Sequence, residues 1–338
     1  MTSYLGHDRE RRIFCQSFAR GTLHHAWILA GDKGLGKAGF AMQAAHFLLS
    51  SDQNPSTFCN EPDDQAAKLL SAGSHPDFRL LERGPRTDKE EKKARDSGLK
   101  SLEEHELARN IKIAQVRSLQ SLFSSQSSIS KYRVVVIDAI DDLERSGANA
   151  LLKNLEEPPK NTVFLLVSHA PERLLPTIRS RCQLLRFDSL SSDQVSEILR
   201  AKSPDLSEQE LQSLVKAGAG SPGQALQFVD ANLSELEEIA SRIMQFGDQS
   251  NALKVDLAKK LALKAATSRY RAFLARVPSL MAQQIKLLDK NNQLNAIERW
   301  REASDLAATA IPKALDNQAV VFQLGRLMGS LAEHQSRA

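Results

Sequence analysis

The sequence lacks the features that mark a secreted or membrane-spanning chain. No run of about eighteen apolar residues occurs in it, and its beginning, MTSYLGHDRERR, has no apolar stretch of the signal-peptide kind. Only three cysteines are present, Cys15, Cys59 and Cys182, and they lie far apart. Such usage fits a reducing compartment and leaves too few thiolates for a four-cysteine zinc site. We therefore expect a cytoplasmic protein without a membrane segment.

The sequence also lacks a dominant charge. Lys and Arg number 45 against 41 Asp and Glu, a formal net charge of +4. This balance is too mild to indicate nucleic-acid binding by the whole chain, so any DNA contact would need a local basic surface. Hydrophobic residues make up 41% and charged residues 25%, which is the composition of an ordinary globular protein. With 338 residues the chain exceeds one ordinary core, and we expect two or three domains.

A strand, a glycine-rich turn and a helix follow one another near the N-terminus. The apolar run 26–30 predicts the strand, and apolar residues with helical spacing after Lys37 predict the helix. Between them the pattern G-x-x-x-x-G-K runs from Gly31 to Lys37 and includes Gly34 and Gly36. Backbone N–H groups of such a loop surround phosphate oxygens, and the helix N-terminus adds a favourable dipole. The same pattern also fits a glycine turn kept for packing alone.

The segment 148–182 carries the most informative pattern. Its first helix must end before Pro158, because the residue preceding a proline is disfavoured in the α region. The β-branched and aromatic run 162–167 is typical of a strand buried on both faces in a parallel sheet. A short helix over 171–178 then leads to Ser180-Arg181-Cys182. Taken singly, this arginine fits a solvated or paired surface residue, and this cysteine fits a small core residue.

The motif LLKNLEEPP, followed by a strand and then SRC, closely resembles the AAA+ domain of bacterial clamp-loader subunits, the DNA polymerase III γ/τ and δ′ family. The resemblance implies that Arg181, with Ser180 beside it, reaches the γ-phosphate of ATP held by a neighbouring subunit. It further implies γ/τ and δ subunits as partners. Through the assembled complex, it implies the β sliding clamp and primed DNA as well.

The resemblance also assigns roles around the glycine loop. Asp138, at the end of the apolar run 133–138, matches the Walker B aspartate, and Ser168 matches the polar sensor after the next strand. Three positions depart from the pattern of the family's ATPases, which have a magnesium-binding Ser or Thr, a water-polarising Glu and a phosphate-contacting Arg there: Ala38, Ala139 and Gly223. Phosphoryl transfer depends on placed positive charge, a metal and an oriented water. We therefore expect no independent ATPase activity.

The region that matches the family's zinc module lacks most of that module's cysteines. Relatives carry cysteines at i, i+3 and i+6, where this chain has Cys59, Pro62 and Gln65. One thiolate cannot hold a structural zinc ion, and His75 fits a turn residue before Pro76. We expect no metal and no required cofactor. Any remaining ATP binding would be weak and would use the residues of the degenerate site: Gly31, Gly34, Gly36, Lys37, Asp138 and Ser168.

The expected fold is an α/β P-loop domain with a parallel sheet over 1–187, followed by two helical domains. These are a three-helix lid over 188–235 and an all-α collar over 236–338, whose oligomerising role comes from the resemblance. Capping patterns at Ser191 and Ser207 predict the first lid helices. The charged segment 82–109 predicts a surface insertion of unassigned role.

An intact Arg181 beside a depleted pocket favours a δ′-type subunit of DNA polymerase III, which is largely inert toward ATP and donates its arginine in trans. A catalytically active γ/τ-type ATPase is the alternative, favoured by Lys37 and Asp138. A P-loop DNA-binding or kinase-like protein outside replication is a third alternative, and it requires the EEPP and SRC matches to be accidental.

Overall fold

The computed structural model describes residues 6–54, 58, 64–85, 107–124, 129–231, 234–263 and 266–333. The chain divides into two compact units, Met1–Gln194 and Val195–Ala338. The finer division at 187 and 235 into three domains stays a prediction. Cys59, Pro62 and residues 86–106 of the charged segment lie outside the described residues, so what the sequence predicts for them also stays a prediction.

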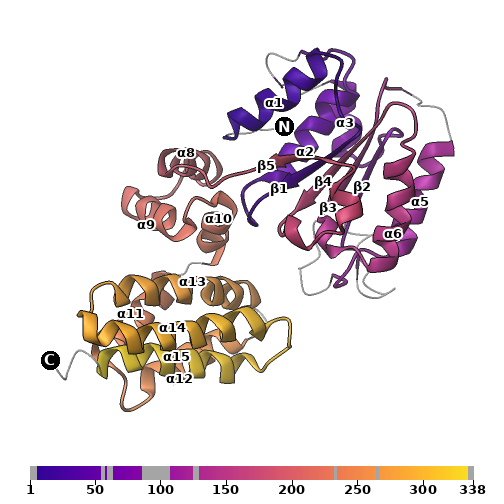
Figure 1. Ribbon diagram of the computed structural model, residues 1–338. Coiled ribbons are helices and arrows are strands. Elements are labelled where there is room, and N and C mark those ends of the chain that lie inside the picture. The colour runs from indigo at the N-terminus through magenta and orange to yellow at the C-terminus, as the bar shows by residue number, and fades with distance from the viewer. Residues whose placement is uncertain are drawn as a thin grey trace. The chain divides into compact units, whose positions relative to one another are not determined.

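A parallel sheet of five strands forms the centre of the first unit, with the order β2-β3-β4-β1-β5 (Figure 1). The three central strands are continuous apolar runs, as strands covered on both faces require. The strands predicted at 26–30, 133–138 and 162–167 are confirmed, the last with one further residue. The strands are β1 (Ala26–Ala30), β2 (Phe78–Glu82), β3 (Arg133–Asp138), β4 (Thr162–Ser168) and β5 (Gln183–Arg186).

Helices cover both faces of this sheet (Figure 1). Trp27 and Leu29 of β1 pack with one set of helices, whereas Ile28 and Ala30 pack with the other, which is the two-residue period of a strand. The first set comprises α1 (Asp8–Ala19), α2 (Lys37–Leu49) and α3 (Gln65–Ser71). The second set comprises α5 (Ile113–Ser124), α6 (Arg145–Glu156) and α7 (Pro176–Arg179).

The single helix expected over 171–178 is instead two short ones. A 3₁₀ turn, η4, covers Pro171–Arg173, and α7 begins only at Pro176. Leu175 between them has φ −54° and ψ 131°, because the proline that follows excludes the α conformation at this residue. The break leaves α7 as one turn whose end carries Ser180 and Arg181.

The second unit is helical throughout its described elements. Ser207 and Glu210 form the reciprocal capping box that the sequence predicts at the start of α9. Side chains from α9 to α15 share one apolar cluster, so their stripes bury one another as in a helical bundle. The helices are α8 (Ser192–Lys202), α9 (Glu208–Gly218), α10 (Pro222–Ala231), α11 (Ser234–Phe246), α12 (Ala252–Ala262), α13 (Thr267–Ile285), α14 (Lys290–Ala310) and α15 (Asn317–Glu333).

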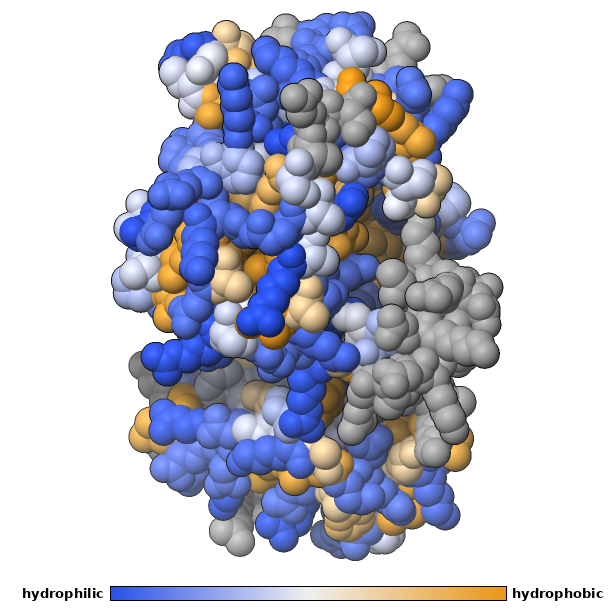
Figure 2. Space-filling view, turned by 90° about the vertical axis from the view of Figure 1, so that its right-hand side faces the viewer, coloured by the Kyte–Doolittle hydropathy of each residue, from blue (hydrophilic) through white to orange (hydrophobic). Residues whose placement is uncertain are grey.

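The surface agrees with the composition. On the face drawn in Figure 2, hydrophilic residues prevail and apolar residues form separate patches. Among the residues that the structure describes, no helix has the length and apolar character needed to cross a bilayer.

Candidate nucleotide site and exposed arginine

The predicted nucleotide-site residues meet at the carboxyl end of the sheet. Ala30, the last residue of β1, lies beside Ser168 of β4, and Asp138 of β3 lies beside Glu82 of β2. The glycine loop starts directly after β1 at this same edge. Open α/β sheets bind their ligands outside the carboxyl ends of the strands. The structure therefore brings Asp138 and Ser168 to the edge from which the loop begins.

The glycine loop has the backbone of a phosphate-binding turn. Gly31, Gly34 and Gly36 have φ values of 151°, 89° and 84°, a region that favours glycine. A Cβ on Gly31 would also lie 2.4 Å from the carbonyl oxygen of Phe187. Packing therefore requires glycine at position 31, whether or not a nucleotide binds. Both interpretations of the glycine pattern remain compatible with this loop.

Lys37 turns back onto its own loop. Its Nζ donates hydrogen bonds to the carbonyl oxygens of Gly31 at 2.6 Å and Asp32 at 2.5 Å, and the residue is only 2% exposed. Burial lowers the pKa of Lys37 to about 8, although Asp138, Asp32 and Asp141 act in the opposite direction. In an occupied P-loop this lysine contacts the β- and γ-phosphates. Here the ammonium group is satisfied within the chain.

Several charged groups lie close to Asp138. Burial raises the pKa of Asp138, while the charge of Lys37 partly offsets the effect and Asp142 adds to it. Burial and the neighbouring Asp138 likewise raise the pKa of Glu82. Asp142 is paired with Arg83, with 3.4 Å between Nε and Oδ2. The lysine is thus the main counter-charge of the half-buried Asp138.

Asp141, on the turn that follows β3, contacts the end of the neighbouring strand β4. It accepts hydrogen bonds from the Ser168 hydroxyl at 3.0 Å, the His169 amide at 2.7 Å and the Ala170 amide at 3.2 Å. Ser168 is fully buried, so its hydroxyl is bound to the chain itself. A carboxylate two or three residues after a strand is the signal that predicts such a cap, since it can reach the end of the adjacent strand.

These residues fit part of a magnesium nucleotide. The positive-φ glycines and the N-terminus of the thirteen-residue α2 suit a phosphate group. Ala38 and the buried Ala139 offer only methyl groups, so neither supplies an oxygen for Mg²⁺ or for an attacking water. Gly223 belongs to the other unit and has no side chain to contribute. The donor set suits phosphate binding better than metal-assisted hydrolysis.

Arg181 lies at the opposite end of the sheet from the glycine loop. It directly precedes β5, whose first residue Gln183 pairs with Trp27 near the start of β1. The glycine loop follows the end of β1, so at least the length of a four-residue strand, about 13 Å, separates the two features. The arginine side chain is 35% exposed. It therefore lies at a surface, at the end of the sheet away from the chain's own phosphate loop.

The neighbouring residues of the tripeptide are also resolved. Arg181 Nη1 donates to the Thr177 carbonyl oxygen at 2.9 Å and the Ser180 hydroxyl at 3.3 Å, and Nη2 lies 2.8 Å from Glu156 Oε1. Cys182 is half-buried, and burial raises the pKa of its thiol to about 12. Cys182 packs against the apolar cluster on one face of the sheet, which fits the small core residue that the sequence predicts.

The region next to the predicted zinc-module positions holds a hydrogen-bonded cluster. Asp64 caps α3 by accepting from the Ala67 amide at 2.6 Å, and it also accepts from His46 Nε2 at 2.8 Å and Ser50 Oγ at 2.5 Å. The buried His75 accepts from the Asp77 amide at 3.2 Å through Nδ1. Within the described ranges, no group of three or more His, Cys, Asp and Glu side chains could hold a metal ion.

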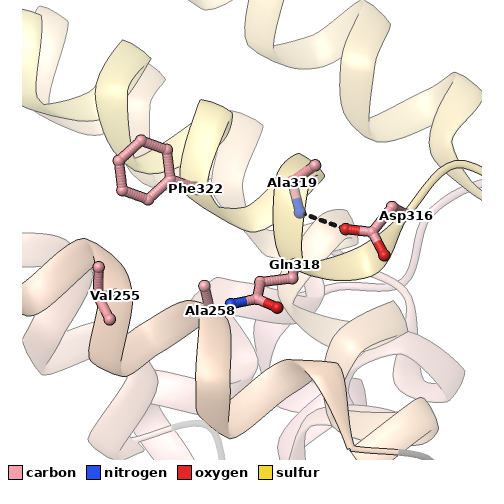
Figure 3. Close-up of a pocket in the computed structure, with 6 residues that line it drawn as sticks. All are labelled: Val255, Ala258, Asp316, Gln318, Ala319 and Phe322. Carbon is pink, nitrogen blue, oxygen red and sulfur yellow. Dashed lines mark hydrogen bonds between the residues drawn. The ribbon is translucent and has the colours of Figure 1, made fainter.

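A separate cavity lies in the second unit between α12 and α15 (Figure 3). Asp316, its single carboxylate, is occupied in accepting the Ala319 amide at 2.8 Å at the start of α15. None of the residues that line it is cationic, so it is unsuited to a phosphate ligand. Its volume is about 310 Å³, and it is lined by Val255, Ala258, Asp316, Gln318, Ala319 and Phe322.

A family model and curated relatives match this chain to DNA polymerase III subunits. The family model described as DNA polymerase III, delta subunit, matches residues 6–191. A relative from Pseudomonas aeruginosa named DNA polymerase III subunit delta′ is 32% identical over 213 residues, covering 63% of this chain and 58% of the relative. The tau/gamma subunit of Haemophilus influenzae is 29% identical over 212 residues, covering 62% of this chain and 27% of the relative.

The matched stretch spans 50–59% of the length of the delta′ relatives, so the likeness covers a little over half of those proteins. Among solved structures, a γ-subunit-related protein from Thermotoga maritima aligns with a TM-score of 0.48 at 13% identity, covering 94% of this chain and 99% of that one. The family model and the curated relatives do not favour the third alternative, a P-loop protein outside replication.

Proposed function

Because the chain belongs to the DNA polymerase III delta subunit family, we propose that it acts as the δ′-type subunit of a bacterial clamp loader. In this role it is largely inert toward ATP. It assembles with γ/τ and δ subunits, and the complex loads the β sliding clamp onto primed DNA. Arg181 acts as the arginine finger on the ATP of a neighbouring subunit, with Ser180 beside it.

One contrast supports this proposal above the rest. Arg181 is accessible at the end of the sheet opposite the chain's own glycine loop, where a second subunit can approach it. The loop's own surroundings provide methyl groups at positions 38 and 139 in place of a magnesium ligand and a water-orienting carboxylate. A subunit with this arrangement contributes to a neighbour's site more readily than to its own.

Arg181 acts in this proposal by electrostatic stabilisation. During transfer of the γ-phosphoryl group, negative charge is spread over its oxygens, and a guanidinium brought from outside stabilises that charge. A trans arginine is worth on the order of 10³–10⁵ in related phosphoryl transfers. The effect on a whole complex is smaller when only one of several ATP sites depends on this finger.

The test is an ATPase measurement on the isolated chain and on the complex reconstituted with γ/τ and δ subunits. We expect the isolated chain to be inactive and Arg181→Ala to lower the ATPase activity and clamp loading of the complex while co-elution stays intact. Arg179→Ala removes an exposed arginine two residues away and serves as the matched control. Wild-type turnover by the Arg181→Ala complex, or comparable turnover by the isolated chain, would contradict the proposal.

A γ/τ-type ATPase is the second candidate, because the loop frame and Lys37 are present and Asp138 occupies the Walker B position. Calorimetric titration of the isolated chain with Mg·ATP separates the two. Tight, magnesium-dependent binding followed by turnover indicates a γ/τ-type subunit. Weak binding without magnesium dependence indicates the δ′ type.

A further inference from the structure

Glu156 holds the guanidinium of Arg181 in the isolated chain. Glu156 is the last residue of α6, and its Oε1 lies 2.8 Å from Arg181 Nη2. The other terminal nitrogen, Nη1, donates to the Thr177 carbonyl oxygen and the Ser180 hydroxyl. Acceptors from two helices therefore fix one orientation of the arginine side chain.

We propose that Glu156 is the holding partner of Arg181: it pairs with the guanidinium when no triphosphate faces it, and it competes with a neighbour's triphosphate for it. This inference rests on the proposed function, because the competitor is the γ-phosphate of a neighbouring subunit's ATP. Glu156 contacts the finger and not the phosphate, so it acts through Arg181.

The exposure of the pair makes such an exchange feasible. The side chains of Arg181 and Glu156 are 35% and 48% exposed, so water screens their attraction. An exposed ion pair of this kind changes the equilibrium between the paired and the released side chain by no more than about fivefold. A guanidinium bound to a phosphate gains shorter, charge-assisted and often bidentate hydrogen bonds. The pair with Glu156 therefore orders the Arg181 side chain, and a triphosphate that binds the guanidinium more strongly displaces Glu156.

The chain provides a matched control beside Glu156. Glu157 follows α6 with non-helical backbone angles, φ −121° and ψ 75°, and its side chain is exposed. Among the described contacts of Arg181, the carboxylate partner is Glu156 and not Glu157. Replacing either residue with Gln removes one negative charge, but only one replacement removes the partner of the finger.

The first test uses the isolated full-length chain and does not depend on any partner subunit. Phenylglyoxal modifies accessible, unpaired arginines, and peptide mass spectrometry reports the rate at Arg181. We expect Glu156→Gln to raise this rate about two- to fivefold, within the range of an exposed ion pair, and Glu157→Gln to leave it unchanged. Equal rates in both variants, at unchanged thermal unfolding, overturn the holding role.

The second test measures the ATPase rate of the reconstituted complex at limiting ATP. Glu156→Gln should raise this rate by up to about fivefold, because release of the finger no longer breaks an ion pair. In an Arg181→Ala background, Glu156→Gln should have no effect, because this double-mutant cycle leaves no arginine for Glu156 to pair with. A lower rate for Glu156→Gln alone means that the carboxylate positions the finger for reaction, which overturns the competition.

The two tests separate the two proposals. If Arg181→Ala leaves the ATPase rate of the complex unchanged, the proposed finger role fails, whereas a faster phenylglyoxal reaction in Glu156→Gln still establishes the pairing in the chain. If Arg181→Ala lowers the rate and Glu156→Gln changes neither readout, the finger role stands and the holding role fails.

Discussion

Lys37 Nζ donates to the carbonyl oxygen of Gly31 at 2.6 Å, so the last residue of the glycine loop binds the first. The same Nζ donates to the carbonyl oxygen of Asp32, so the lysine side chain closes its own loop. This contact gives the intact G-x-x-x-x-G-K pattern a structural reason as well as a nucleotide-binding one. The lysine therefore has partners within the loop that do not depend on a bound magnesium nucleotide.

The burial of Lys37 predicts a stability that rises at alkaline pH. The folded-state pKa of about 8 lies below the ordinary lysine value of 10.5, so between these pH values the unfolded chain binds more protons than the folded chain. Stability from this group therefore increases as pH rises through that window. The full difference corresponds to about 3 kcal/mol, at about 1.4 kcal/mol per unit of pKa.

Urea unfolding at a series of pH values from 7 to 10 measures this contribution. Lys37→Met should flatten the rise in unfolding free energy relative to the wild-type chain. Lys33→Met removes an exposed lysine of the same loop and serves as the control for the loss of one positive charge. If unfolding free energy depends on pH in the same way for Lys37→Met and the wild type, then Lys37 has the same pKa in the folded and unfolded chain, which contradicts the prediction.

A hydroxyl restored at position 38 should restore magnesium dependence. Ala38→Thr supplies the missing ligand, and Ala38→Val supplies the same shape and the same β-branching without the oxygen. We expect Mg²⁺ to tighten ATP binding to the Thr variant by on the order of tenfold over the Val variant, equivalent to about 1.4 kcal/mol. Isothermal titration with ATP in the presence and absence of Mg²⁺ provides the comparison. Identical behaviour of the two variants would mean that the loop does not bring residue 38 to a nucleotide-bound metal.

Much of the first unit could be predicted from sequence because its central strands are continuous apolar runs. The bounds of β1 and β3 agree with the prediction to the residue. These strands are buried on both faces, so local hydrophobicity alone reports their position. The division of the predicted 171–178 helix was missed, although Pro176 carried the signal for it.

Side-chain partners were less predictable than elements. The contacts of Asp141 with the end of β4 and of Glu156 with Arg181 join residues that are 27 or 25 positions apart in the sequence. Such contacts depend on which strands and helices lie side by side, and the spacing of apolar residues does not contain that information. The contact of Lys37 with the carbonyl groups of its own loop could not be predicted for a different reason. The same sequence pattern also fits a lysine that binds a phosphate.

Asp141 should be more important for stability than its neighbour Asp142. Asp141→Asn retains one acceptor oxygen but places an NH₂ group where an acceptor was needed, so at least one of the three bonds from residues 168–170 is lost. We expect a loss of about 1–3 kcal/mol in unfolding free energy. Asp142→Asn removes a partly exposed pair with Arg83 and should cost less than about 1 kcal/mol. Urea unfolding of both variants ranks them, and the reverse order would contradict the capping role.

Asp64 should make a pH-dependent contribution that joins α2 to α3. Burial alone would raise the pKa of Asp64, but hydrogen bonds from Ser50, Ala67 and His46 outweigh it and lower the pKa below the ordinary 3.8. A carboxyl group with a lowered folded-state pKa stabilises the fold above its unfolded-state pKa. That contribution is lost as pH falls through the folded-state value.

Asp64→Asn should therefore destabilise the chain by about 1–3 kcal/mol at pH 7, because the carboxylate that accepts bonds from both helices is replaced by a half-matching amide. The difference between wild type and variant should shrink as pH is lowered below 3.8, where the wild-type carboxyl group also becomes protonated. Asp52→Asn, at an exposed position after α2, controls for the loss of charge. Urea unfolding at pH 7, 5, 3.5 and 2.5 tests both statements. A constant difference across that range would mean that the shape of the side chain, and not its charge, holds the two helices together.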